Sequence, residues 1–213
     1  MYIDKGNLVN RIIDAAQTYK NYLIGHTFMF VYGDEKIEVI FKTESFLHLT
    51  GVASTLYAKD FYKKAKNRNL KTTEIRFDTQ HPADFADIKT QYLQRLYELT
   101  ISEIFIAHDI VTMSATYALG LTNLQFVLCC GKNTDKFGKI IDDCYVPYSF
   151  RVEEIENKRY GNLYPIDYIF KKQTSCNQYS EITYGDIDSI DNISDNIKIN
   201  FTYLMEHHNK KTS

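Results

Sequence analysis

Residues 27–43 have the sequence TFMFVYGDEKIEVIFKT. Two runs rich in β-branched and aromatic residues lie on either side of a Gly-Asp-Glu turn, and in the second run Ile37, Val39 and Phe41 share one face of an extended chain. Turn residues between two such runs are typical of a hairpin. The stretch therefore predicts two antiparallel strands joined by a short turn.

Helical spacing surrounds this hairpin. Before it, apolar residues at three- and four-residue steps predict an amphipathic helix from about Leu8 to Leu23, ending at Gly25. After it, the same spacing predicts a helix over about 54–67 and a longer helical region from about 82 to 106.

The period changes to that of strands after about residue 112. Strands are predicted over 113–119, 124–130, 145–152 and 165–171, with 178–184 as a candidate edge strand. This order predicts an α+β fold in which N-terminal helices pack on a mostly antiparallel sheet. We expect one such domain over residues 1–185 and an acidic C-terminal extension over 186–213, which either packs loosely or forms a late helix.

Composition excludes several classes of protein. The 213 residues are 44% hydrophobic and carry 25 Lys and Arg against 27 Asp and Glu, a formal charge of -2. A wholly disordered chain is excluded, and any nucleic-acid surface must be a local patch. No apolar run approaches the roughly 18 residues that span a bilayer, and no secretory signal is present, so we expect a cytoplasmic protein without membrane contact.

The four cysteines show neither a CxxC pair nor a histidine at zinc-finger spacing. Sequence signatures of nucleotide-binding loops, metalloproteases and calcium loops are absent too. We therefore expect reduced thiols, and neither a metal ion nor a cofactor.

The first candidate for chemistry is KTESFLHLTG, residues 42–51. If this segment is extended, His48 and Thr50 point the same way, with Phe46 beside them. An imidazole can transfer protons near neutral pH, and a threonine hydroxyl can hold a phosphate oxygen or orient the imidazole. The alternative is an ordinary hydrogen-bonded histidine at a strand end, which is the more frequent situation for a lone histidine.

The second candidate is YVPYSFR, residues 145–151. On a regular strand Tyr145, Pro147, Ser149 and Arg151 share one face, and the proline favours an edge position or a bulge that re-aims side chains. Ser149 and Arg151 together could form a phosphate clamp. A surface arginine stacked on a tyrosine is the equally weighted alternative.

A basic run is the third candidate, and aromatic residues are interleaved in it. This mixture suits a phosphate backbone with stacked bases, although a solvated helix face is the more frequent meaning of such a run. The nucleic-acid-binding residues that it predicts are Lys59, Lys63, Lys64, Lys66 and Arg68.

Four blocks in this order resemble a known family: Phe-x-His-Leu-Thr-Gly at 46–51, LGLTN at 119–123, YVPYSFRVE at 145–153 and YPIDYIF at 164–170. The family is the fourth phage-associated branch of the Barnase–EndoU–colicin–RelE-like nucleases (the PBECR group), found in phages and mobile elements of low-GC bacteria. The resemblance covers roughly residues 8–185.

The resemblance implies a metal-independent endoribonuclease, active in conflict between phage and host, that uses the RNA 2′-hydroxyl as nucleophile and leaves a cyclic phosphate. Such chemistry needs a base, an acid and positive charge around the phosphate. On this basis His48 is the acid or base, Lys42 and Arg151 hold the phosphate charge, and Thr50 and Ser149 donate hydrogen bonds.

A second hypothesis is a non-enzymatic phage protein that binds and inhibits a host factor, such as a defence or CRISPR component. Net acidity suits a protein that competes with nucleic acid. The two hypotheses differ in one respect: a nuclease must bring His48, Ser149 and a lysine or arginine into one site, whereas an inhibitor need not. RNA and a host protein are thus the two expected partners, and the oligomeric state is open.

Overall fold

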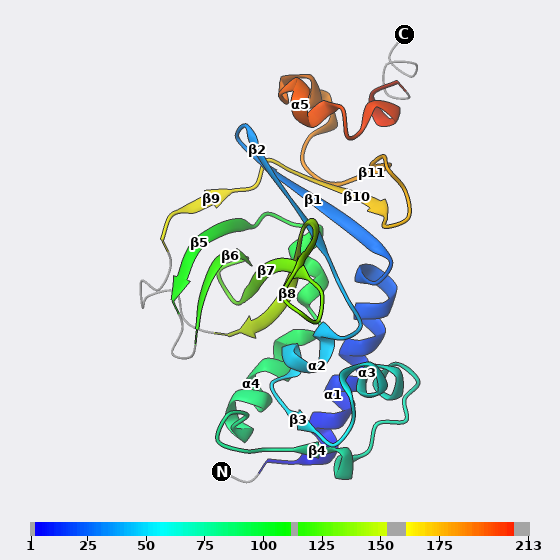
Figure 1. The fold of residues 1–213 in the computed structure, drawn as a ribbon, viewed down its shortest axis with the longest axis vertical. Helices are drawn as coiled ribbons and strands as arrows, with labels where there is room; N and C mark the ends of the chain where they lie inside the picture. Colours follow the sequence, from blue (N-terminus) through cyan, green and yellow to red (C-terminus); the bar gives the residue numbers. More distant parts are fainter. Residues whose placement is uncertain (1–2, 112–114, 153–160, 207–213) are drawn as a thin grey trace.

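A single large sheet organises the fold (Figure 1). The computed structural model describes residues 3–111, 115–152 and 161–206, and within them nine strands follow the order β11-β10-β1-β2-β8-β7-β6-β5-β9. These strands are β1 His26–Tyr32, β2 Glu35–Ile40, β5 Phe105–Val111, β6 Thr116–Thr122, β7 Val127–Thr134, β8 Ile140–Arg151, β9 Leu163–Pro165, β10 Tyr168–Gln173 and β11 Glu181–Tyr184. A separate ribbon pairs β3 (Ala53–Ser54) with β4 (Ile75–Arg76).

Helices cover one face of this sheet (Figure 1). They are α1 Lys5–Thr18, its π-helical continuation Tyr19–Leu23, α2 Ser45–Thr50, α3 Ala58–Lys66, α4 Ala83–Leu93 and the 3-10 turns Thr72–Glu74 and Leu96–Thr100. Within the described residues, the strand pairs are antiparallel except for β2 with β8, which run parallel where Val39 lies opposite Tyr145. The predicted α+β class, with N-terminal helices on a mostly antiparallel sheet, is confirmed.

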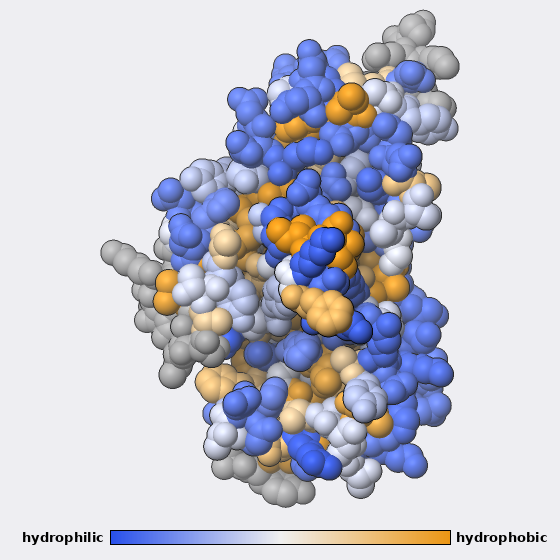
Figure 2. Space-filling view, viewed as in Figure 1, coloured by the Kyte–Doolittle hydropathy of each residue, from blue (hydrophilic) through white to orange (hydrophobic). Residues whose placement is uncertain are grey.

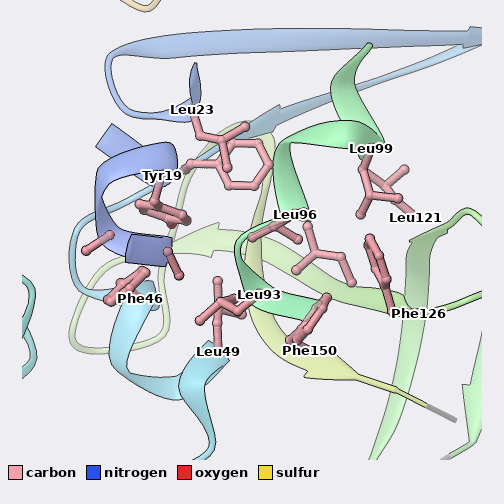
Figure 3. Close-up of a cluster of buried hydrophobic side chains, with 14 of the residues drawn as sticks. Tyr19, Leu23, Phe46, Leu49, Leu93, Leu96, Leu99, Leu121, Phe126 and Phe150 are labelled. Atoms are coloured by element: carbon pink, nitrogen blue, oxygen red, sulfur yellow. The ribbon is translucent and has the colours of Figure 1, made fainter. Parts of the chain in front are cut away.

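The main core lies between the helices and the sheet (Figure 3). Tyr19 is buried there against Phe46, with ring centroids 5.1 Å apart, and its hydroxyl donates to the Lys42 carbonyl at 2.9 Å. Phe126 and Phe150 approach from the sheet with centroids 5.1 Å apart. The core therefore fixes α2 against β8, and these two elements carry His48 and Arg151.

The sequence analysis considered residues 46–51 as an extended segment. In the structure they form the helix α2 and its C-terminal glycine. In α2 the residues Phe46, Leu49 and Thr50 are buried at helical spacing, and Gly51 ends the helix in the left-handed region with φ +76°. The apolar residues are too few to distinguish a short helix from a strand by period. Because residues two apart on a helix point in different directions, His48 and Thr50 do not share a face.

The long helical region predicted up to residue 106 is also wrong in extent. Helix α4 ends at Leu93, a 3-10 turn follows, and β5 begins at Phe105. The apolar side chains Leu96 and Leu99 are buried as their spacing indicated, although the backbone there is not α-helical. Only the first two residues of β5 fall within the expected helix, and neither β5 nor the short strand β9 was predicted.

The segment after Tyr184 packs closely rather than loosely. It forms a 3-10 helix at Ile187–Asn192 and the helix α5 at Asp195–Lys198, followed by helical residues 202–206. Its apolar residues pack on the face of β1 and β10 that the N-terminal helices leave open, and Phe201 stacks on Phe170 with centroids 4.3 Å apart. The extension thus forms a second core together with β1 and β10.

Candidate functional site

His48 lies on the outward face of α2, a short helix that packs against β8, α3 and α4. Although the residue keeps an exposed edge, its pKa is lowered, first by partial desolvation of the ring and then by the positive charges of His81 and Lys89. His81 lies just before α4, and Lys89 lies within that helix. His81 and Lys89 are the two charged groups that lower the pKa of His48.

His81 is held in the turn before α4 by one carboxylate. The Oδ1 atom of Asp78 lies 3.0 Å from Nδ1 of His81 and accepts from the backbone N–H groups of Gln80 and His81 at 2.9 and 2.8 Å. The hydrogen bonds from His81 lower the pKa of Asp78, so the carboxylate stays ionised. Because Nδ1 is held by Asp78, Nε2 is the ring nitrogen left for other partners.

Lys89 connects His48 to the end of β8. Its aliphatic stem passes over Gly51, where an added Cβ atom would lie only 2.8 Å from Lys89 Cδ. Lys89 also lines a small pocket together with Arg151, Phe85 and Ile88. The Nε atom of Arg151 donates to Ser149 Oγ at 3.0 Å. We call His48, Asp78, His81, Lys89 and Arg151 the histidine cluster.

Two of the five predicted catalytic residues lie together beside α4: Arg151 lines the pocket with Lys89, and Ser149 is hydrogen-bonded to Arg151. His48 lies on the neighbouring helix α2. Ser149 and Arg151 face one way, but Tyr145 and Pro147 do not share that face. The β7–β8 register shifts between Cys129, opposite Ser149, and Cys130, opposite Pro147, so Tyr148 is an extra residue. The bulge expected from the proline is confirmed, and the single face predicted for 145–151 is wrong.

Lys42 and Thr50 have other contacts. Thr50 is fully buried, and its hydroxyl donates to the Leu47 carbonyl at 2.6 Å and accepts from Val52 N–H at 3.3 Å. These bonds stabilise the end of α2. The Lys42 ammonium donates to Asn133 Oδ1 on β7.

The basic run forms α3 and the turn after it. Carboxylates pair with three of its five predicted residues: Lys59 with Glu44 at 3.0 Å, Lys64 with Glu74, and Arg68 with Asp14 at 3.5 Å. Lys63 is exposed and Lys66 half-buried. Much of the positive charge on this helix is thereby offset, and its role in binding nucleic acid stays a prediction.

Neither His81 nor Lys89 is among the catalytic residues predicted from the sequence. His81 stands just before a helix-starting proline, and Lys89 follows it by about two helical turns. Only the packing of α4 against α2 brings them to His48. The spacing of residues along the chain does not indicate that α4 packs against α2.

Chemically, the cluster offers two imidazoles, an ammonium group and a guanidinium group. Such a set can move protons and hold an anion. Over the described ranges, no group of three or more His, Cys, Asp or Glu side chains is arranged to hold a metal ion, and no helix is long and apolar enough to cross a membrane.

These features define a class of protein: an α+β domain with helices on one face of an antiparallel sheet and acid–base side chains gathered where a short helix meets a strand end. The sequence model of the phage-Barnase-EndoU-ColicinE5/D-RelE like nuclease4 family (PBECR4) matches residues 11–188, so the chain belongs to this nuclease family. The resemblance noted in the sequence is confirmed. No curated protein and no solved structure matches the chain.

Proposed function

We propose that the chain is an endoribonuclease that cleaves RNA without a metal ion, by attack of a 2′-hydroxyl on the adjacent phosphodiester. Membership of a nuclease family supports the reaction class. The observation that carries the finer proposal is the position of Lys89, whose stem passes over Gly51 at the end of the helix that carries His48 and which lines one pocket with Arg151. An RNA substrate also favours the cytoplasm as the place of action.

His48 is the base in this proposal. Its lowered pKa keeps the imidazole neutral at pH 7, so that it can accept the proton of the 2′-hydroxyl. His81 is the acid: with Nδ1 held by Asp78, it presents Nε2 to the 5′-oxygen that leaves. The products are a 2′,3′-cyclic phosphate and a free 5′-hydroxyl, and the proton taken by one histidine balances that given by the other.

Lys89 and Arg151 offset the charge that develops on the phosphate oxygens. Both line the same pocket beside α4, and a guanidinium can bind two oxygens at once. Ser149 positions Arg151 through the 3.0 Å bond to Nε. Arg151 keeps the role expected of it, and Lys89 takes the role expected of Lys42, because Lys42 is bonded to Asn133. Thr50 has no role in this proposal, because its hydroxyl is bonded to backbone.

The test is cleavage of an end-labelled oligoribonucleotide by the purified full chain in the presence of EDTA. Mass spectrometry should find a cyclic phosphate on the upstream product, and a 2′-O-methyl strand of the same sequence should resist. His48→Ala and His81→Ala, purified in parallel to control for contaminating ribonuclease, should each lower the rate by roughly 10²- to 10⁴-fold. The proposal would be refuted if the variant with both substitutions cleaved RNA as fast as the parent chain. Cleavage of the 2′-O-methyl strand by the parent chain would refute it too.

A further inference from the structure

A cleft separate from the histidine cluster lies between β2 and β8. In the described residues, Val39 and Tyr145 are the only pair of opposed residues between these strands. Before that pair, the first half of β2 and the start of β8 diverge. The cleft between them has a volume of about 520 Å³. Its walls come from β1, β2, β5, β6, β7 and β8.

Aromatic rings line this cleft. Tyr32 lies beside His108, with ring centroids 6.4 Å apart, and His108 meets Tyr164 edge-on at 5.4 Å. Tyr145 also lines the cleft, and its ring carries the Lys132 ammonium 4.2 Å from its centroid. The protein's own lysine thus shows that this ring face accepts a cation.

The charge of the cleft is negative. Its lining contains four carboxylates, Glu35, Glu38, Asp142 and Asp143, against two lysines, Lys36 and Lys132, which gives a formal charge of -2 with His108 neutral. Lys36 is already bonded to Glu38 at 3.5 Å and to Asn200 at 3.0 Å. A phosphate backbone would be repelled here, whereas a planar cation would meet both carboxylates and ring faces.

An exposed apolar hairpin adjoins the cleft. The β7–β8 turn presents Phe137 at 82% exposure and Ile140 and Ile141 at 57% each, and Asp142 and Asp143 of the cleft follow directly in β8. Figure 2 shows apolar atoms gathered at the centre of the view, over this hairpin. Because Ile140 and Ile141 point to opposite sides of a strand, the hairpin is apolar on both faces.

The turn is pre-organised. Asp135 Oδ1 accepts from the backbone N–H of Phe137 at 2.8 Å and of Lys139 at 3.0 Å, and Gly138 adopts φ +82°. The exposed side chains therefore stand on a fixed support. Aliphatic groups on two faces of a projecting hairpin are suited to a groove in another protein rather than to stacked bases.

We propose that the β7–β8 hairpin and the β2–β8 cleft form one docking surface for a partner protein with a basic contact segment, from which an arginine side chain enters between Tyr32 and Tyr145. The guanidinium stacks on the rings and bonds Glu35 and Asp143 at the rim, while Phe137, Ile140 and Ile141 enter an apolar groove of the partner. This surface serves recognition and is independent of the proposed cleavage chemistry.

The test is an NMR titration of the isotope-labelled full chain with a synthetic hexapeptide of alternating leucine and arginine. Shifts should concentrate at Tyr32, Tyr145 and the hairpin, and a hexapeptide of alternating leucine and glutamate should not produce them. Glu35→Gln with Asp143→Asn should weaken binding roughly three- to tenfold. The matched control, Asp60→Asn with Asp191→Asn, removes two exposed charges elsewhere and should leave binding unchanged.

A second pair of variants tests the hairpin. The double variant Ile140→Ser, Ile141→Ser should also bind the arginine peptide more weakly. Ile199→Ser, at a position 66% exposed, should leave the affinity for the peptide unchanged. All these positions are exposed, so folding should be retained, which the same spectra show. The proposal is overturned if millimolar peptide produces no localised shifts, if the charge variants bind as the parent does, or if hexauridylate shifts the cleft residues more strongly than the arginine peptide.

Discussion

The Nε atom of Arg151 donates to Ser149 Oγ at 3.0 Å, just beyond the β-bulge at Tyr148. The bulge matters because it places Ser149 and Arg151 on the face of the sheet shared by Cys129 and Val127, opposite the face that carries Pro147. A serine that orients a guanidinium acts through that guanidinium. This relationship separates the expected effects of the two residues.

Ser149→Ala should lower RNA cleavage by a smaller factor than Arg151→Ala, because the guanidinium remains but loses one hydrogen bond, worth about 1 kcal/mol or roughly fivefold. Ser149→Thr, which keeps the hydroxyl, is the conservative comparison. Steady-state kinetics on one oligoribonucleotide would measure all three. If Ser149→Ala is as slow as His48→Ala, the serine itself contacts the reacting phosphate.

Lys89→Met should raise the pKa of His48, because it removes a neighbouring positive charge while retaining an aliphatic stem over Gly51. A ¹³C or ¹⁵N NMR titration of the imidazole checks this directly. The acidic limb of the cleavage pH profile should move upward with it, since the base must be neutral to act. Lys63→Met, on the exposed face of α3, is the control. An unchanged His48 titration would show that Lys89 lies too far away to matter.

Stability should fall as pH decreases from about 7 to 5.5. The pKa values of His26 and His48 are lowered, in both cases first by desolvation, so the unfolded chain takes up protons there before the folded chain does. Uptake by the unfolded state favours unfolding, beginning near the ordinary histidine pKa of about 6.5 and complete below the folded values. Urea unfolding at both pH values measures this, and the double variant His26→Gln, His48→Gln should show a smaller difference.

Gly51→Ala should destabilise the fold and lower cleavage together. A left-handed backbone costs a non-glycine residue about 1–2 kcal/mol, and the new methyl group would displace the Lys89 stem. Gly138→Ala is a matched control, since its φ of +82° imposes a similar backbone cost with no atom within 4 Å of the added Cβ. Equal thermal stability and equal activity of the two variants would contradict the predicted contact with Lys89.

Phe201→Ala should cost about 3–5 kcal/mol, because a fully buried ring stacked on Phe170 is removed. Ile199→Ala, at an exposed position of the same segment, should cost little. Chemical denaturation gives both values. A small effect of Phe201→Ala would mean that the C-terminal segment contributes little to the stability of the rest.

The sequence predicted the class of fold because periodicity is a local property that the hairpin and the later strands express clearly. It failed at residues 46–51, where six residues hold too few apolar positions to separate two periods. For the site, His48, Ser149 and Arg151 were identifiable from residue type and placement. Lys89 was not, since its relation to His48 arises from α4 packing on α2, and the bulge at Tyr148 changed which side chains share a face.

The parallel contact between Val39 and Tyr145 has a consequence for synthesis of the protein on the ribosome. Strands β1 and β2 emerge early, yet their sheet neighbours β10 and β8 lie more than 100 residues later in the chain. The nascent hairpin therefore keeps both of its edges unpaired until translation has nearly finished, and such long-range pairing is slow. Arg151 cannot reach its place beside Lys89 before β8 has been made, so the arrangement proposed for cleavage cannot form on a short nascent chain.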